Sequence, residues 1–214
     1  MPKDYFEEAF ESNKDGFGFA FREKGKITYK KGFMKIDEAW EAYSLFLENV
    51  VFPHVVHFRL GTPVCEELTH PFEITSLSEL SLENTVDSEV LFHNGIVTGW
   101  RDRLWDWFAQ EQYIPDGKIS DTRVVAGLMS KYGDRIFEFI TGKFVVFGDK
   151  RLETFGEFTN HEGIRYSNDS YKPKTYYTST WGKAYQRPNS DIWNKNANHT
   201  NNQLPLYLID EFLI

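Results

Sequence analysis

Short apolar runs, each followed at once by a polar motif, are the feature that most constrains how this 214-residue chain folds. Aromatic residues make up 17% of the sequence, and many stand in alternating or continuous apolar runs of strand length. Such runs are typical of strands packed in sheets. The run Val50 to Arg59 leads into a long polar loop, Gly61 to Thr75, and Val90 to His93 leads into Asn94-Gly95. We therefore predict a sheet-rich fold with polar groups at strand ends.

Fewer segments have the periodicity of helices. Pro2 to Ser12 and Asp37 to Leu47 predict helices, and Trp100 to Gln112 predicts a helical or irregular aromatic segment. Ser120 is a natural N-cap for a further helix that follows it. Other strands are predicted at residues 17–22, 27–30, 137–140, 144–149, 152–155 and 163–166. Strands outnumber helices, which predicts an α+β layering of sheets covered by helices.

Composition narrows the class of protein. The net charge of −8 argues against a general nucleic-acid binder, because phosphate binding needs a basic surface. Cys65 is the single cysteine, so the chain has no internal disulfide framework. The sequence shows neither a signal peptide nor a membrane-length apolar segment, so we expect a cytoplasmic protein without a membrane partner. The histidines lack ligand spacing, and we expect no metal and no cofactor.

Four polar motifs each have a structural reading beside a functional one. Arg59, at a strand end, can bind a carboxylate with two parallel hydrogen bonds, or form a surface ion pair. His70 can supply a donor near the same loop or simply pack. Asn94-Gly95 can direct an amide and a backbone N–H at an oxyanion, or form a hairpin turn. Asp121 can accept an α-amino group, or only favour the dipole of the helix that Ser120 caps.

The order of these motifs along the chain is stronger evidence for a functional interpretation than any single motif. Together they resemble the glutaminase domain of class II glutamine amidotransferases, which are N-terminal-nucleophile hydrolases, in a compact version associated with phage and bacterial proteins. The resemblance covers roughly Asn13 to Tyr171. Its motifs are Asn13-Lys14-Asp15-Gly16-Phe17-Gly18-Phe19-Ala20, His57-Phe58-Arg59-Leu60-Gly61-Thr62, Thr69-His70-Pro71-Phe72, His93-Asn94-Gly95, Ser120-Asp121-Thr122 and the stretch Gly163 to Tyr171.

The resemblance implies a four-layer αββα sandwich and a pocket for glutamine or a similar amino-acid amide. Arg59 would bind the α-carboxylate and Asp121 the α-amino group, with Thr62 and His70 lining the pocket. Asn94 and Gly95 would form the oxyanion hole. In this family an N-terminal cysteine attacks the side-chain amide and ammonia is released. A synthase partner protein is then a possible acceptor of that ammonia.

This chain departs from the family at the nucleophile. It begins Met1-Pro2-Lys3, so the family's first strand and cysteine are missing from it. Either the true start lies upstream, or the nucleophile has been lost and the pocket kept for binding. Cys65 lacks an adjacent α-amine and, without an electropositive setting, is a poor nucleophile. Arg123 stands where the family often has an acidic residue, a change expected to alter ligand preference.

Residues 1–171 are therefore predicted to form a glutaminase-like domain, and residues 172–214 an irregular C-terminal extension packed on it. The apolar end, Leu204 to Ile214, is a candidate to replace the missing strand. Three functions stay open. The first is amide hydrolysis, and the second is binding without catalysis on the same scaffold. The third is a docking surface formed by the aromatic residues Trp100, Trp105, Trp107 and Phe108, for which core packing is the alternative.

Overall fold

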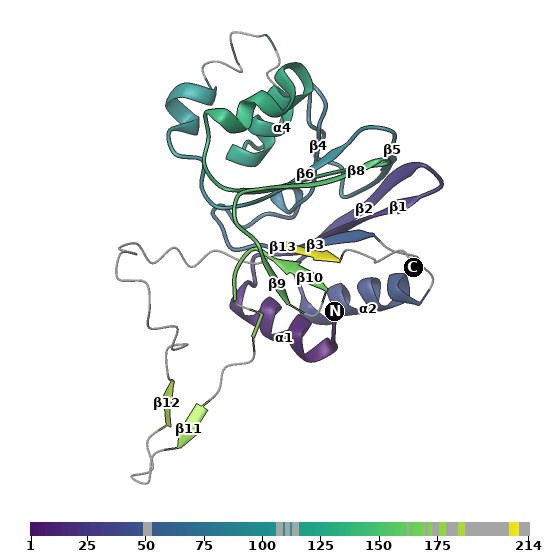
Figure 1. Ribbon diagram of the computed structural model, residues 1–214, viewed down its shortest axis with the longest axis vertical. Helices are drawn as coiled ribbons and strands as arrows, with labels where there is room; N and C mark the ends of the chain where they lie inside the picture. Colours follow the sequence, from purple (N-terminus) through teal and green to yellow (C-terminus); the bar gives the residue numbers. More distant parts are fainter. Residues whose placement is uncertain are drawn as a thin grey trace.

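The fold combines helices with antiparallel sheets and belongs to the α+β class (Figure 1). The computed structural model describes residues 1–48, 53–105, 109, 112, 116–161, 163–169, 171–172, 176–178, 184–186 and 206–209. Within these residues the α+β expectation from the sequence is confirmed.

The larger sheet has seven strands in the order β5-β2-β1-β3-β13-β10-β9, all paired antiparallel. Its strands are β1 (Phe17–Glu23), β2 (Lys26–Phe33), β3 (His54–Phe58), β5 (Glu83–Val86), β9 (Thr159–His161), β10 (Ile164–Tyr166) and β13 (Leu206–Ile209). The smaller sheet has the order β4-β6-β7-β8, from β4 (Phe72–Glu73), β6 (Val90–Asn94), β7 (Lys143–Gly148) and β8 (Arg151–Phe155). A separate hairpin joins β11 (Tyr176–Thr178) to β12 (Ala184–Gln186).

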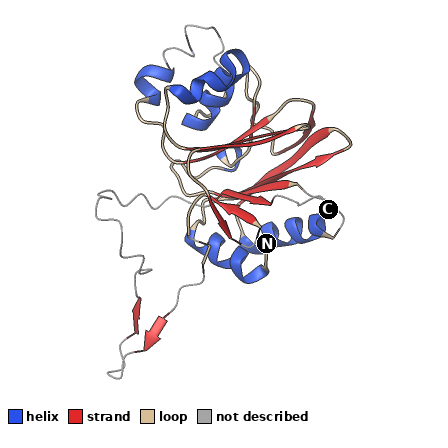
Figure 2. Ribbon diagram, viewed as in Figure 1, coloured by secondary structure: helices blue, strands red, loops and turns tan. Residues whose placement is uncertain are grey.

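Helices cover the outer faces of the two sheets (Figure 2). The α-helices are α1 (Lys3–Ser12), α2 (Ile36–Leu47) and α4 (Asp121–Tyr132). A turn of 3-10 helix, η1 (Glu66–Leu68), and a π-helical segment, η2 (Trp100–Leu104), lie between α2 and α4, and a second 3-10 segment, η3 (Gly133–Glu138), directly follows α4. Figure 1 shows α1 and α2 beside the larger sheet and α4 beside the smaller one.

Three apolar clusters correspond to this arrangement. One packs α1 and α2 on the larger sheet, where Phe6 contacts the rings of Phe17, Tyr43 and Phe58. A second joins the facing sides of the two sheets, and the third packs α4 on the smaller sheet. Burial of these aromatic rings, each worth roughly 1.5–3 kcal/mol, holds the sheets and helices in place.

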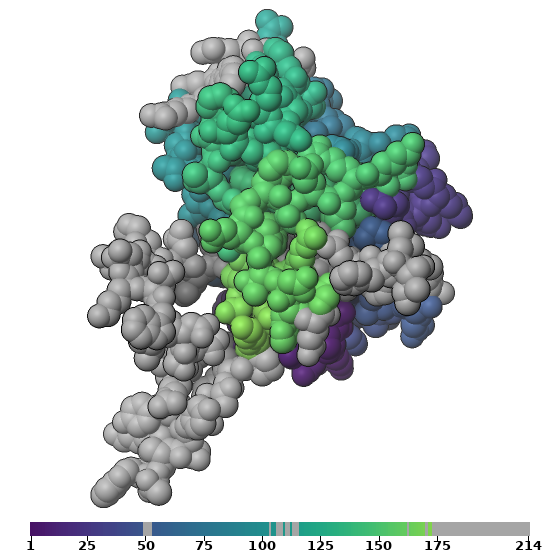
Figure 3. Space-filling model, in the orientation of Figure 1, coloured from purple at the N-terminus to yellow at the C-terminus, as the bar shows by residue number. Residues whose placement is uncertain are grey.

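The C-terminal apolar segment supplies a strand to the larger sheet. β13 lies between β3 and β10, with Leu206 opposite His57 and Ile209 opposite His54. Its first residue is thus at the end of β3 that leads into Arg59. Figure 3, in the same orientation, shows the green residues of β7 to β10 across the middle of this face, between the helical regions.

Two local predictions were wrong. Residues 137–140 were predicted as a strand, but Phe137 belongs to η3 and stacks on Phe155 at 4.0 Å. These apolar residues cover the smaller sheet from outside instead of joining it. Their composition is typical of a strand, and the strand prediction failed for that reason. The predicted loop from Gly61 to Thr75 also contains η1 and β4. No helix in the described part of the chain is long and apolar enough to cross a membrane.

Candidate functional site

A cavity of about 370 Å³ opens where β3 and β6 end and α4 begins. The structure brings all six residues predicted for the site to its lining: Arg59, Thr62, His70, Asn94, Gly95 and Asp121. Apolar side chains complete the lining, among them Leu60, Leu68, Ile96, Trp100 and Ile119. The strand-end motifs thus converge in space, while the chemical roles suggested for them stay predictions.

Arg59 is buried and fixed by the loop that it starts. Its backbone N–H donates to Gly16 O at 2.7 Å, and its guanidinium donates to Gly61 O at 3.0 Å and Pro63 O at 2.9 Å. These bonds use two of the five guanidinium N–H donors. Burial lowers the pKa of Arg59, while the nearby Asp15 and Asp121 oppose that change. The guanidinium remains a cation with donors available for an anion.

The Asn13-Lys14-Asp15-Gly16 turn supports the Arg59 loop from behind. Asn13 caps α1, and its Nδ2 donates to Ala9 O at 2.7 Å. Asp15 Oδ2 accepts from Gly61 N at 2.9 Å. Gly16 has φ +123°, and a Cβ there would lie 2.4 Å from Thr69 Cγ2. The turn therefore positions the loop, which is the structural reading of this motif.

Asp121 stands at the first turn of α4, and backbone donors orient its carboxylate. Oδ2 accepts from Val97 N at 3.0 Å, and Oδ1 accepts from Thr122 N at 2.8 Å. Ser120 is the N-cap as predicted, since its Oγ accepts from Arg123 N at 3.2 Å. The helix dipole favours an anion at this position. A cap and a carboxylate facing the cavity thus coexist on neighbouring residues.

A buried histidine network underlies the cavity. Thr122 Oγ1 lies 3.1 Å from both His70 Nε2 and His93 Nδ1. The rings of His57 and His70 are 4.0 Å apart. Burial lowers the pKa of His57 to about 3 and of His93 to about 4, and it lowers the pKa of His70 well below its ordinary value. All three rings are neutral at pH 7, so the charged groups of the lining are Arg59, Arg101 and Asp121.

The Asn94-Gly95 corner is held against the larger sheet. Asn94 Nδ2 donates to Ser167 Oγ at 2.6 Å, and Lys143 Nζ donates to Ser167 O. Gly95 has φ +141°, a conformation that favours glycine. A ligand oxygen that accepts from the Asn94 amide would therefore share that donor with the Ser167 hydroxyl, or displace the hydroxyl from it. Ser167 belongs to the predicted closing stretch, but no sequence signal assigned its side chain to this corner.

Arg123 does not line the cavity, contrary to the expectation that it changes the charge beside the ligand. Its guanidinium is buried and donates to four backbone carbonyls: Ser78 O at 2.8 Å, Asp116 O at 2.8 Å, Lys118 O at 2.7 Å and Leu77 O at 3.3 Å. The side chain points into the loops behind α4 because their carbonyl oxygens need donors. Its role in this structure is to join two loops.

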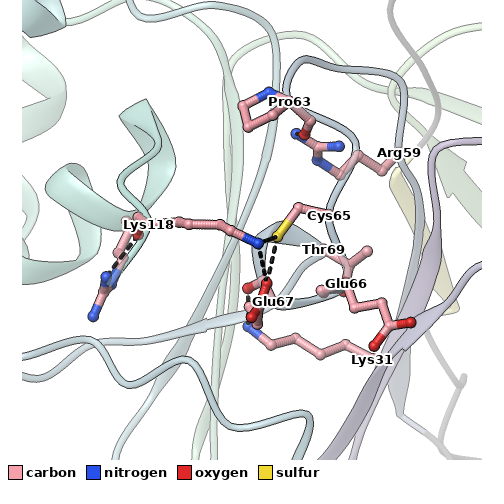
Figure 4. Close-up of polar contacts among 9 residues, drawn as sticks. Lys31, Arg59, Pro63, Cys65, Glu66, Glu67, Thr69 and Lys118 are labelled. Atoms are coloured by element: carbon pink, nitrogen blue, oxygen red, sulfur yellow. Dashed lines mark hydrogen bonds and ion pairs between the residues drawn. The ribbon is translucent and has the colours of Figure 1, made fainter. Parts of the chain in front are cut away.

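Cys65 has a more polar setting than its sequence neighbours indicated. Lys118 Nζ lies 2.9 Å from Cys65 Sγ (Figure 4). Cys65 is not among the described residues that line the cavity. Sequence reasoning missed this contact because 53 residues separate the two partners. The expectation of a thiol without a nearby cation was therefore wrong.

The aromatic segment only partly tests the docking hypothesis. Trp100 lines the cavity, and both Trp100 and Trp105 pack against the cluster around α4. Trp107 and Phe108 lie outside the described residues. The two described tryptophans thus follow the core-packing alternative. Among the described residues, no group of three or more His, Cys, Asp or Glu is arranged to hold a metal ion.

Comparison with known proteins identifies the fold. No protein-family model matches the chain, and neither does any curated protein. Among solved structures, the chain is similar to the glutamine phosphoribosylpyrophosphate amidotransferase of B. subtilis, complexed with ADP and GMP, with a TM-score of 0.52 and 20% identity. The fold is shared with a glutamine amidotransferase. The match covers 76% of this chain and 33% of that one, so the chain spans about a third of the enzyme's length.

Proposed function

We propose that the cavity binds glutamine, or a closely related amino-acid amide, through its α-carboxylate and α-amino groups. The observation that carries this proposal is the convergence of Arg59 and Asp121 on one cavity of about 370 Å³. A buried guanidinium and a carboxylate held by backbone amides are complementary to the two charges of a free amino acid. Fold similarity to a glutamine amidotransferase supports the same ligand class.

Hydrolysis of the amide is the reaction that this pocket would serve. Asn94 Nδ2 and Gly95 N–H would stabilise the oxyanion, which is worth roughly 3–4 kcal/mol per donor. The described lining residues include no cysteine, so the attacking thiol would come from a Met-Cys segment preceding Met1. Ammonia would then be released to water or to a synthase partner. Binding without catalysis is the second candidate, favoured by the bond from Asn94 to Ser167.

Finer parts of the proposal follow from the same resemblance. We assign the layers to the four-layer αββα sandwich of N-terminal-nucleophile hydrolases, in the compact version of phage and bacterial proteins. Residues 1–171 would form the glutaminase-like domain and residues 172–214 an extension packed on it. A cytoplasmic location is part of this proposal.

Titration calorimetry with glutamine, glutamate and γ-glutamyl amides tests binding. Arg59→Ala and Asp121→Ala should each weaken glutamine binding roughly 10- to 100-fold, since each removes charge-assisted hydrogen bonds. Arg135→Ala, at an exposed arginine of η3, and Asp87→Ala are matched controls that should bind normally. Absence of binding by the folded wild-type chain would reject the proposal.

Ammonia release separates the two candidates. The chain as it stands and a version extended to an upstream Met-Cys start are compared with glutamine as substrate. Turnover in the extended form alone supports hydrolysis. Binding without turnover in both forms supports the non-catalytic candidate.

A further inference from the structure

A cluster outside the cavity joins the chain's one thiol to an amine and a carboxylate. Lys118 Nζ lies 2.9 Å from Cys65 Sγ and 2.9 Å from Glu67 Oε2. The Cys65 thiol also donates to the Glu67 carboxylate. Figure 4 shows the Lys118 side chain reaching across to Cys65 and Glu67 from the segment that precedes α4. The sulfur and the lysine nitrogen are therefore already within hydrogen-bond distance.

The surroundings favour reaction of this thiol with a small oxidant. Cys65 is 7% exposed, whereas the side chains of Lys118 and Glu67 are 54% and 42% exposed, so the cluster borders solvent. The Arg59 guanidinium lies on the far side of Cys65 from Lys118 (Figure 4), and its charge interacts with Cys65. Peroxides oxidise cysteine in its thiolate form, so the first step of such a reaction requires loss of the Cys65 proton.

We propose that Cys65 and Lys118 form an oxidative modification site, in which a hydroperoxide links Sγ to Nζ by a covalent S–N bond. This site is distinct from the amino-acid cavity and does not depend on the function proposed for it. The chemistry needs two reactive side chains and one external oxidant, hydrogen peroxide being the simplest of that class.

The reaction balances in two steps. First, the Cys65 thiolate attacks one oxygen of the peroxide, the O–O bond breaks, and hydroxide leaves and is protonated to water. The product is the sulfenic acid of Cys65. Second, the Lys118 amine attacks the sulfenic sulfur, the S–O bond breaks, and a second water leaves as the S–N bond forms. The sulfur is oxidised, the peroxide is reduced, and the protein loses two hydrogen atoms in total.

Lys118 must release a proton before it attacks. Hydrogen bonds to Cys65 and then Glu67 raise the pKa of Lys118, so the amine is protonated in the reduced protein. Hydrogen bonds from Cys65 and Lys118 lower the pKa of Glu67 to about 2, so its carboxylate holds the lysine beside the sulfur but is too weak a base to take this proton. The Lys118 side chain is 54% exposed, and the proton leaves to solvent.

The bond would join two walls of the cavity. Cys65 follows Thr62 and Pro63, whose loop holds the Arg59 guanidinium through Pro63 O. Lys118 precedes Ile119, Ser120 and Asp121, which line the opposite side. Linking residues 65 and 118 would fix the separation of these walls by a covalent bond, in place of the hydrogen bonds and ion pair of the reduced cluster.

Peptide mapping by mass spectrometry tests the site. The reduced full-length chain is treated with hydrogen peroxide, blocked with a thiol reagent and digested. We expect a cross-linked peptide that contains Cys65 and Lys118 at two hydrogen atoms less than the sum of its parts, and its loss on treatment with dithiothreitol. Its formation should also raise the Tm of the chain.

Variants distinguish this bond from ordinary oxidation. Cys65→Ser should give no cross-link. Lys118→Arg and Lys118→Gln should give none either, and should accumulate a Cys65 sulfenic acid that dimedone traps. Lys118 is exposed, so both variants should keep the wild-type far-ultraviolet circular dichroism. Wild-type protein that gains oxygen on Cys65 with no Lys118 cross-link, or that links Cys65 to another lysine, would overturn the proposal.

Discussion

The Oγ1 hydroxyl of Thr122 lies 3.1 Å from Nδ1 of His93, and the same atom lies 3.1 Å from Nε2 of His70. One hydroxyl can donate one hydrogen bond and accept others, so Thr122 serves two buried rings at once. Thr122 also follows Asp121, whose Oδ1 accepts from the Thr122 backbone N–H. The residue thus connects the histidines to the carboxylate that faces the cavity.

Replacing Thr122 with Val should cost about 2–3 kcal/mol of unfolding free energy. Valine keeps the shape but leaves two buried ring nitrogens without a partner, and each unsatisfied group carries a penalty of about 1–3 kcal/mol. Thr122→Ser, which keeps the hydroxyl, should retain most of the stability. Urea denaturation at pH 7 measures both variants, and equal midpoints for Val and wild type would contradict the role assigned to the hydroxyl.

Acidification should destabilise the chain below pH 6.5. The folded-state pKa values of His57 and His93, about 3 and about 4, lie below the unfolded value of 6.5 because burial disfavours the charged rings. The unfolded chain therefore binds more protons between pH 6.5 and 4, and stability falls as pH falls through that range. The combined loss from these two rings is on the order of several kcal/mol, and their contribution to stability is complete above pH 6.5. Urea midpoints that stay constant from pH 7.5 to 4.5 would show that these rings are not buried as described.

Because Lys31 is buried, the free energy of unfolding should also rise with pH above neutrality. Burial first, and then the charge of Arg123, lowers its pKa from 10.5 to about 7 in the folded state. Between pH 7 and 10.5 the unfolded chain keeps a proton that the folded chain has released, so stability rises with pH. The expected rise from pH 7 to 9 is about 2 kcal/mol. Lys31→Met should remove this slope, whereas Lys30→Met, at a half-buried neighbour that pairs with Glu83, should keep it.

Much of the site was predictable because its signals are local. Side-chain alternation fixes which face of β3 carries His57 and Arg59, and the Ser120 cap needs only the residues of its own turn. The convergence of these motifs was inferred from their order along the chain, and the cavity lining agrees with it.

The parts that could not be predicted depend on contacts between distant segments. β13 finds its register beside β3, about 150 residues earlier, and nothing in its short apolar sequence specifies that partner. The Arg123 side chain points toward carbonyl oxygens of two separate loops, among them those of Leu77 and Lys118, which only the folded chain brings together. Phe137 has a strand-like composition, but it packs on Phe144 and Phe155 from outside the sheet.

Replacing Arg123 with Met should destabilise the chain without changing ligand preference. The substitution keeps an unbranched stem but removes the donors to four backbone carbonyls, and the expected cost is about 3 kcal/mol. Arg101→Met, at an exposed arginine that lines the cavity, is a matched control for charge and should leave stability unchanged. Thermal and urea denaturation measure the difference, and a stable Arg123→Met variant with altered glutamine binding would restore a role for Arg123 in the ligand pocket.

Gly18→Ala should disturb both the fold and the cavity, because the backbone of His70 passes directly over Gly18. A Cβ at this position of β1 would lie 2.1 Å from His70 O and 2.7 Å from Lys31 Cβ, closer than real contacts allow. Since His70 O belongs to a backbone that carries a buried ring, it cannot move without breaking the contact from that ring to Thr122. We expect a loss of at least about 3 kcal/mol, at the upper end of overpacking effects.

Gly133→Ala is the matched control: its φ is +60°, but no atom lies within 4 Å of the added Cβ, so backbone strain alone should cost about 1 kcal/mol. Equal destabilisation of the two variants by urea denaturation would mean that β1 and the His70 segment are not in this contact.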